Sequence, residues 1–244
     1  MLNVSLNQFK LDYLKKKNQV IYYSLKSEGS DDIENLINNF LQEKNSFIFE
    51  SVEKGKIKGR YTIFGKNPDK IWEFNNLECN IKVGKNKKKL KGTPKKNLEK
   101  IIENFKFSTP KELPPICSLI SGYFSYDIIR YIENIPNKNK DDLNIPDARI
   151  LRPKNLVIHD NIDKKIYFIV NIFKDEKITS FEEKYNEIIK QIEEMVFLSN
   201  YKNSFSKINR KPVLPKVKSN ISKSKFLSNV MKAKKYIKIG DIFQ

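Results

Sequence analysis

Few residues of this sequence could bind a metal or form a disulfide. It has two cysteines, Cys79 and Cys117, and one histidine, His159. Two cysteines cannot build the disulfide framework of a small secreted protein, so we expect a reduced pair. One histidine excludes a two-histidine zinc motif such as HExxH, and the wide spacing of the cysteines excludes a CxxC site. We therefore predict no metal site in this chain.

Long apolar runs and a signal sequence are also lacking. No stretch approaches the roughly 20 apolar residues of a membrane span. Residues 1–10, MLNVSLNQFK, do not have a basic start followed by an apolar core. We expect a cytoplasmic protein without a membrane partner. Hydrophobic residues make up 39% of the 244, which is enough for a sizeable core and argues against a disordered chain.

Arginine is scarce although the chain is basic. The net charge is +18, but only five of the 47 basic residues are arginine. Base readout and bidentate phosphate binding favour arginine because of its planar fork. The densest basic run, Lys85–Lys91, contains no aromatic residue that could stack on bases, and we expect it to be a solvated loop. We therefore predict that nucleic acid is not a partner.

Hydrophobic patterning predicts strands and helices in a mixed order. The clearest helix covers 181–197, where Ser180 and Glu183 match a capping box. Thr93-Pro94 is a typical helix start, and we expect Ser30 or Asp31 to cap an earlier helix. Because hairpins interrupt any strict β-α-β alternation, we predict an α+β fold with layered, mainly antiparallel sheets and flanking helices. The predicted strands cover 19–25, 46–51, 58–65, 70–75, 78–83, 116–126, 155–160 and 165–172, and the other helices cover 126–133 and 222–239.

A change in composition divides the chain. Residues 199–220 are rich in Ser, Asn, Lys and Pro, which is typical of a linker or long surface loop. We therefore predict one region over 1–198, a linker over 199–220, and the first helix of a second region over 221–244. The last residues, 241–244, look like the start of a strand without a partner for its backbone groups. We expect a truncated chain.

Three segments, taken in order, resemble the large subunit of anthranilate synthase, called component I. Residues 46–65, SFIFESVEKGKIKGRYTIFG, are similar to the family's Leu-Leu-Glu-Ser strand followed by Gly-Arg-Tyr-Ser. Residues 122–136, GYFSYDIIRYIENIP, are similar to its Gly-Tyr-Phe-Gly-Tyr-Asp-x-x-Arg-Tyr-x-Glu pattern. Residues 219–244 end in GDIFQ and are similar to the opening of the chorismate-binding region, and 146–160 fit the stretch between the second and third segments. The resemblance covers nearly the whole chain.

The resemblance implies a fold, a reaction and partners. The family converts chorismate and an ammonia equivalent to anthranilate and pyruvate, with Mg2+ in the active site. A glutaminase subunit, component II, supplies the ammonia, and L-tryptophan inhibits the large subunit. The catalytic groups, the Mg2+ carboxylates and the chorismate ligands of the family lie beyond the equivalent of Gln244. The resemblance therefore assigns no catalytic residue to this chain and implies that the fragment alone is inactive, truncated before the chorismate-binding core is complete.

The same resemblance implies part of a tryptophan site. The family's motif falls on Ile48–Ser51, with Ile48 and Phe49 where the family usually has Leu. The implied tryptophan-binding residues are Phe49, Glu50 and Ser51. A carboxylate such as Glu50 can hold an ammonium group through charge-assisted hydrogen bonds, and Ser51 offers a hydroxyl and a backbone N–H. In the absence of the resemblance, an exposed strand-end Glu followed by a turn Ser would be the simpler interpretation.

Other polar and aromatic residues have simpler explanations. We expect Arg60 to neutralise a nearby carboxylate, and Asp127 to pair with Arg130 at a buried helix start. We expect His159 to be a strand residue without chemistry. The tyrosines at 123, 126 and 131 are expected to pack in the core.

Three alternatives stay open. The sister enzyme, aminodeoxychorismate synthase component I, shares the fold, but GDIFQ at 240–244 and GRYT at 59–62 are more typical of the anthranilate enzyme. A stand-alone regulatory module would bind an amino acid without catalysis, and tight tryptophan binding by the 244 residues alone would favour it. A nucleic-acid binder would show specific, salt-resistant retardation of a nucleic acid.

Overall fold

A computed structural model describes residues 2–27, 29–50, 59–137, 140–141, 143–201 and 216–243. The chain divides into two compact units, Met1–Asn203 and Ser204–Gln244. No helix in these described ranges is long and apolar enough to cross a membrane. The first unit contains α1 (Leu6–Leu14), β1 (Gln19–Lys26), α2 (Ser30–Phe40), β2 (Phe47–Glu50), β3 (Tyr61–Asn75), β4 (Glu78–Val83), β5 (Asn86–Lys89), α3 (Pro94–Asn104), β6 (Ser121–Phe124), the 3-10 helix η1 (Tyr126–Tyr131), β7 (Ala148–Asp160), β8 (Lys165–Ile172) and α4 (Phe181–Asn200); the second contains α5 (Lys223–Ile239).

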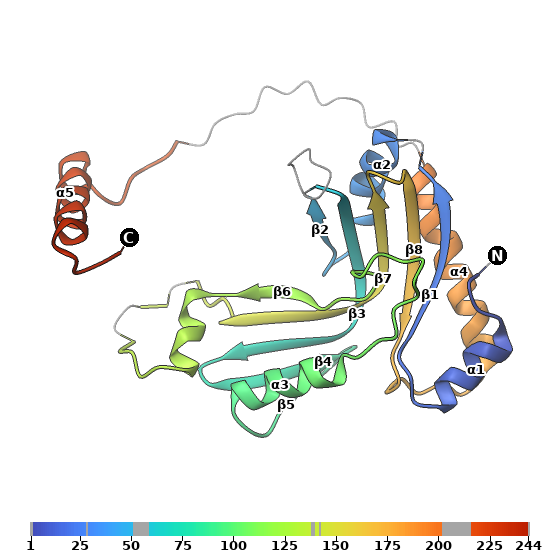
Figure 1. Ribbon diagram of the computed structural model, residues 1–244. Coiled ribbons are helices and arrows are strands. Elements are labelled where there is room, and N and C mark those ends of the chain that lie inside the picture. The colour runs from blue at the N-terminus through green and yellow to red at the C-terminus, as the bar shows by residue number, and fades with distance from the viewer. Residues whose placement is uncertain are drawn as a thin grey trace. The chain divides into compact units, whose positions relative to one another are not determined.

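All strands of the first unit join one antiparallel sheet that bends into two halves (Figure 1). The long strands β3 and β7 pair along nearly their whole length and run through both halves. In the upper half the order is β2-β3-β7-β8-β1. In the lower half it is β5-β4-β3-β7-β6. The two halves therefore share their two central strands, and each adds its own edge strands.

Two prolines face each other where the sheet bends. Pro68 on β3 lies opposite Pro153 on β7, and the register shifts between Pro68 and Lys70. Neither proline has an N–H to donate to the ladder, and the bulge adds a residue on one strand only. Asn67, just before, has a φ of 54°, in the left-handed region that asparagine tolerates better than most residues. The sequence at this point therefore favours a bend over a continuous flat ladder.

A buried arginine ties the bend to the end of β8. The Arg152 side chain is only 8% exposed and donates hydrogen bonds to both carboxylate oxygens of Asp69 and of Asp175. Its guanidinium also lies 3.8 Å from the ring centroid of Phe173. Burial alone would raise the pKa of Asp175, but hydrogen bonds from Arg152 and Lys70 lower it to about 2. The carboxylates of Asp69 and Asp175 thus hold the Arg152 guanidinium from two segments of the chain.

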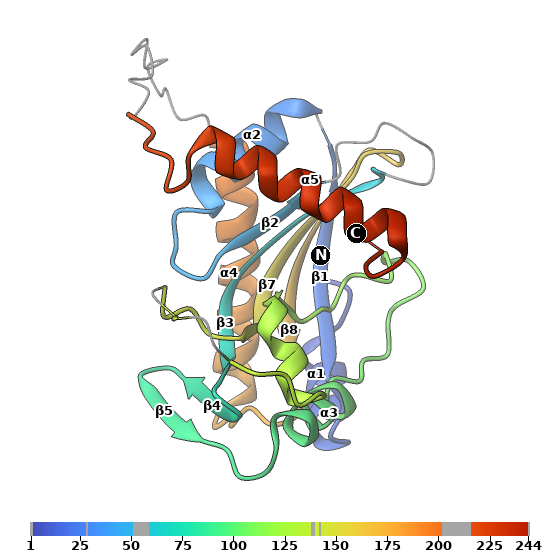
Figure 2. The same cartoon turned by 90° about the vertical axis from the view of Figure 1, so that its left-hand side faces the viewer.

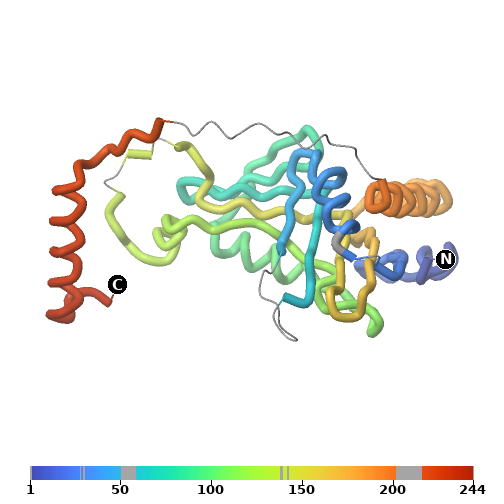
Figure 3. The backbone as a smooth tube through the Cα atoms, turned by 90° about the horizontal axis from the view of Figure 1, so that it is seen from above, coloured from blue at the N-terminus to red at the C-terminus, as the bar shows by residue number. Residues whose placement is uncertain are grey.

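The main core lies between the upper half of the sheet and helices α1, α2 and α4. Figure 3 shows α4 in orange and α1 in dark blue on the same side of the sheet, and Figure 2 shows α4 behind β3 and β7. Strand alternation places every second residue of β8 on this face. The Ser180 hydroxyl accepts from the Glu183 N–H, so the predicted cap of α4 is confirmed. The fully buried side chains of this core include Phe9, Ile21, Leu36, Phe40, Phe64, Phe168 and Ile188.

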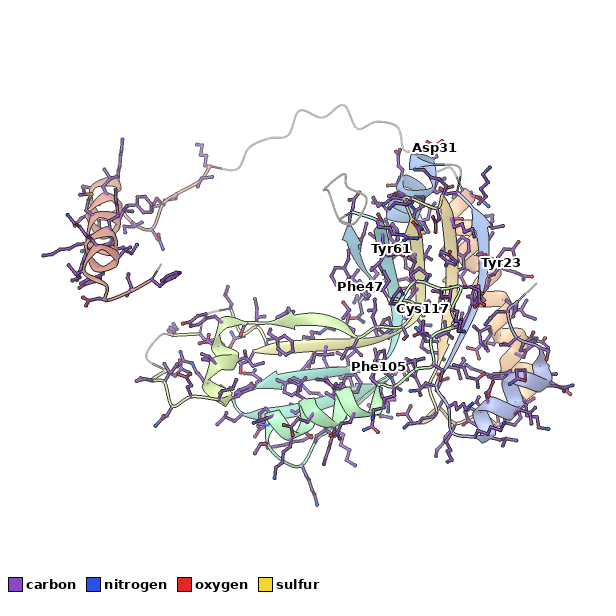
Figure 4. All side chains as sticks on the ribbon, in the orientation of Figure 1. Tyr23, Asp31, Phe47, Tyr61, Phe105 and Cys117 are labelled. Carbon is purple, nitrogen blue, oxygen red and sulfur yellow. The ribbon has the colours of Figure 1, made fainter. Side chains whose placement is uncertain are left out.

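Two smaller cores complete the first unit. The opposite face of the upper half is covered by the segment that follows α3, whose Leu113 and Cys117 are buried (Figure 4). In the lower half, α3 packs its Ile101 against Trp72 and Cys79. The two cysteines therefore lie in separate cores, and both are free thiols. Burial raises the pKa of Cys79 to about 11, so this thiol stays protonated.

The predicted α+β class with mainly antiparallel pairing is confirmed, but several boundaries differ. The two strands predicted at 58–65 and 70–75 are one strand, β3, because its bulge lets pairing continue past Pro68. The buried strand predicted over 116–126 is only β6, and all its residues after Ser121 are exposed. The basic run predicted to be a loop contains β5, which pairs with β4 although its side chains are exposed.

The ends of some elements also differ. Helix α1 was not predicted, since its apolar face is short, yet Ser5 caps it by accepting from the Gln8 N–H. The N-cap of helix α2 is Gly29, with a φ of 118°, whereas Ser30 or Asp31 was the predicted cap. The described residues after α5 form no strand, whereas Gly240 ends that helix in a left-handed conformation, as predicted.

Candidate functional site at the end of strand β2

Strand β2 holds the described part of the predicted tryptophan motif. It pairs with β3 so that Phe49 lies opposite Ile63 and Glu50 opposite Thr62. Phe47 packs directly on Gly65, where a Cβ would lie 2.2 Å from the phenyl ring. Because this glycine has no side chain, β2 can lie close to β3. This contact sets the position of Phe49 and Glu50 further along β2.

Phe49 and Glu50 point to opposite faces of the sheet because they are neighbours on a strand. Phe49 is 47% exposed, and its ring lies 5.0 Å from that of Phe47. Glu50 is exposed and has no ion pair within the described residues. Ser51 lies outside the described residues. A ligand that contacts both Phe49 and Glu50 must therefore lie over the end of β2, where the strand no longer separates the two faces.

A charged cluster lies beside this strand end. Arg60 donates to both oxygens of Asp160, at 2.7–3.1 Å, and to Asp163 at 2.7 Å. Its guanidinium is 5.0 Å from the ring centroid of Tyr61, the first residue of β3. Burial alone would raise the pKa of Asp160, but Arg60 and two backbone N–H groups lower it. The predicted role of Arg60 in neutralising a carboxylate is confirmed.

Behind Glu50, on the helix-covered face, runs a row of buried polar groups. Thr62 lies between Glu50 and His159 in the sheet register. His159 Nε2 is 2.7 Å from the Ser27 hydroxyl, which is 2.8 Å from Asp32. The contact of Ser27 with a carboxylate makes it the donor there, so the imidazole is not its general base. Burial lowers the pKa of His159, which favours the neutral ring.

This row holds the start of α2 against the sheet, and His159 lies on strand β7, as predicted. Sequence reasoning missed its partners because Ser27 is 132 residues away from His159. No spacing rule connects a loop serine to a strand histidine at that separation.

The segment around η1 corrects two predictions. Asp127 and Arg130 do form an ion pair, at 2.9 Å, but the helix start is not buried, since no residue of η1 is. Of the three tyrosines expected in the core, only Tyr131 packs there, with its hydroxyl 2.6 Å from Asp147. Tyr126 is 87% exposed. In the part of the chain that the structure describes, no three His, Cys, Asp or Glu side chains gather into a group that could hold a metal ion.

The depressed carboxyl pKa values predict acid sensitivity. Asp160 and Asp175 have folded pKa values below their ordinary value of 3.8, so each contributes stability above that pH and loses it as the pH falls. For Asp175 the loss extends to about pH 2. We expect the urea midpoint of the wild-type chain to fall steeply between about pH 4 and 2. The double variant Asp160→Asn/Asp175→Asn should fall less over this range, and an identical slope would contradict the assignment.

Comparisons with known proteins agree on one family. The sequence profile described as "chorismate binding enzyme" matches residues 44–244. Anthranilate synthase component 1 of Acetivibrio thermocellus is 34% identical over 213 residues, which is 86% of this chain and 43% of that protein. The protein of the same name from Cereibacter sphaeroides is 25% identical over 98% of this chain and 49% of its own length.

A solved structure gives the same result for the fold. Anthranilate synthase component I from Streptococcus pneumoniae TIGR4 aligns over 82% of this chain and 42% of its own, with a TM-score of 0.54 and 21% identity. The chain spans less than half the length of these relatives. Because the profile of this family matches residues 44–244, most of the sequence, the chain belongs to the family of chorismate binding enzymes.

Proposed function

We propose that the chain is part of the large subunit of an anthranilate synthase, a lyase of tryptophan biosynthesis. In this proposal the complete protein converts chorismate and ammonia to anthranilate and pyruvate, and a glutaminase subunit, component II, supplies the ammonia. The observation that carries the proposal is the similarity to proteins named anthranilate synthase component 1 along 86–98% of the chain. Its motifs at 59–62 and 240–244 support the anthranilate enzyme over its sister.

We assign no reaction step to this chain. The chain covers 43–49% of the length of its relatives, and in our proposal the Mg2+ ligands and the catalytic groups belong to the rest of that length. What the chain contributes is the scaffold and one half of a feedback site.

The proposed feedback site lies over the end of β2 and takes L-tryptophan. Glu50 is an exposed carboxylate without an ion-pair partner among the described residues, so it can accept the ligand's ammonium without giving up an existing contact. Phe49 offers an exposed ring that an indole can stack against. In this proposal Ser51 offers the ligand a hydroxyl and a backbone N–H.

The test is product analysis with the full-length protein, chorismate, ammonium and Mg2+. We expect anthranilate and pyruvate in equal amounts. If 4-amino-4-deoxychorismate forms in their place, the sister enzyme is the correct assignment. If the full-length protein binds tryptophan tightly but consumes no chorismate, the stand-alone regulatory module is correct.

A further inference from the structure

A cavity of about 470 Å³ lies between α3 and the lower half of the sheet. It shares no residue with the candidate tryptophan site. Residues from α3, from the bent strand β3, from the loop before β1 and from the loop after β8 line it together. The fold therefore builds this cavity from segments that are far apart in the sequence, and its volume is within the range of ordinary small-molecule sites.

The floor of the cavity is apolar and partly aromatic. Trp72 on β3 and Ile101 on α3 form it, and both are nearly fully buried. Phe105 closes one end, at the junction of the two halves of the sheet in Figure 4. Its ring lies 5.0 Å from Phe107 and 6.4 Å from Phe173, so it is held in an aromatic group. Above this buried floor, the partly exposed Ile81, Leu90 and Phe105 give an apolar body a surface to pack against.

The rim of the cavity is strongly cationic. Five basic side chains line it and only one carboxylate, Asp175, which two of the five already neutralise. The other three, Lys91, Lys100 and Lys174, are exposed and have no ion pair within the described residues. Lysines alone would not mark a site on a chain with 47 basic residues. Three cations without ion pairs beside an apolar floor do indicate a site. The floor can take the apolar part of a ligand out of water, and the cations can then attract its negative charge.

The walls of the cavity are fixed before any ligand arrives. The Asn18 side chain donates to the Lys106 carbonyl at 2.7 Å and accepts from the Lys174 N–H at 2.9 Å. It thereby joins the loop before β1 to the segments after α3 and after β8. Arg152 on β7 holds Asp175, the residue that follows Lys174. A preformed wall lowers the entropy lost on binding.

We propose that this cavity binds a small organic anion: an apolar body that packs against Ile81, Leu90 and Phe105 above Trp72, and that carries a carboxylate or phosphate held by Lys100 and Lys174. This proposal is independent of the proposed function, since it uses no residue of the tryptophan site and no chorismate chemistry.

The experiment uses Trp72, the single tryptophan of the chain, as reporter. Its fluorescence in the 244-residue chain is titrated with nitrobenzoate, nitrophenyl phosphate, neutral nitrobenzamide and inorganic phosphate. We expect saturable quenching by at least one of the organic anions, and the anion with the lower Kd identifies the preferred group, carboxylate or phosphate. The neutral amide should bind about tenfold more weakly, and inorganic phosphate should not quench. Equal affinity for the amide and the anions, or no saturable quenching, would overturn the proposal.

Paired charge reversals localise the effect. The double variant Lys100→Glu/Lys174→Glu should weaken anion binding about tenfold or more, because two attractions become repulsions. The control Lys88→Glu/Lys190→Glu changes the net charge equally at two exposed lysines outside the cavity, and should leave the affinity within about twofold. Equal losses in both double variants would show that the anions respond to the general charge of the protein and would contradict a site.

Discussion

Replacing Arg152 by methionine is expected to lower the free energy of unfolding by about 3 kcal/mol. Methionine keeps much of the volume but leaves Asp69 and Asp175 without their shared cation. Breaking a buried ion pair from one side costs roughly 3–5 kcal/mol, since the remaining charge stays desolvated. We expect the lower end because Lys70 still pairs with Asp175, whose side chain is 43% exposed. Urea denaturation at pH 7 measures the change.

Two further variants make the Arg152 prediction specific. Adding Asp69→Asn to Arg152→Met removes the most buried uncompensated charge, and should restore at least about 1 kcal/mol. Lys89→Met breaks a surface ion pair with Glu78; the two side chains are 62% and 48% exposed. This change should lower the free energy of unfolding by no more than about 0.5 kcal/mol. A loss for Arg152→Met as small as that for Lys89→Met would mean that the cluster does not stabilise the bend.

Replacing Gly122 by alanine is expected to cost about 1–3 kcal/mol, although the change adds one methyl group to an exposed strand. Gly122 lies opposite Ile150 on β7, and a Cβ there would be 2.0 Å from the Arg149 carbonyl oxygen. The obstacle is backbone, so it cannot turn away as a side chain would, and β6 must separate from β7. Hydrogen exchange of the β6 amides and urea denaturation measure this separation.

A matched glycine provides the control for Gly122. Gly84 has a φ of 57° and nothing within 4 Å of its Cβ position. Asparagine tolerates that backbone conformation, so Gly84→Asn should stay within about 0.5 kcal/mol of the wild type. If the two glycine variants are equally stable, the close contact between Gly122 and β7 does not explain the need for glycine at this position.

Local signals in the sequence explain which elements could be predicted. The Ser180 cap, the Thr93-Pro94 start and the Gly240 end rest on short-range hydrogen bonds and backbone preferences, and all three occur in the structure. The class of fold could also be predicted, because hairpins are formed by neighbouring segments and have local sequence signals. Strand β5 was missed because its stability comes from pairing with β4, whereas its own side chains are charged and exposed.

Long-range features could not be predicted. The bend depends on Pro68 facing Pro153, and the ion cluster joins Asp69 to Asp175 through Arg152. These residues meet only once the register of β3 and β7 is known. The candidate tryptophan residues came from a motif and a predicted strand, but the pairing that puts Glu50 opposite Thr62 depends on the register of β2 and β3.

The most direct test of the account is tryptophan inhibition of the full-length protein with and without Glu50→Ala. Chorismate turnover is followed by anthranilate fluorescence while L-tryptophan is titrated. We expect the wild type to be inhibited, and the variant to need about tenfold more tryptophan. Its uninhibited turnover should be unchanged, because our proposal separates the feedback site from the catalytic groups. Inhibition of both proteins at the same tryptophan concentration, or an equal loss of turnover without tryptophan, would contradict the assignment of Glu50.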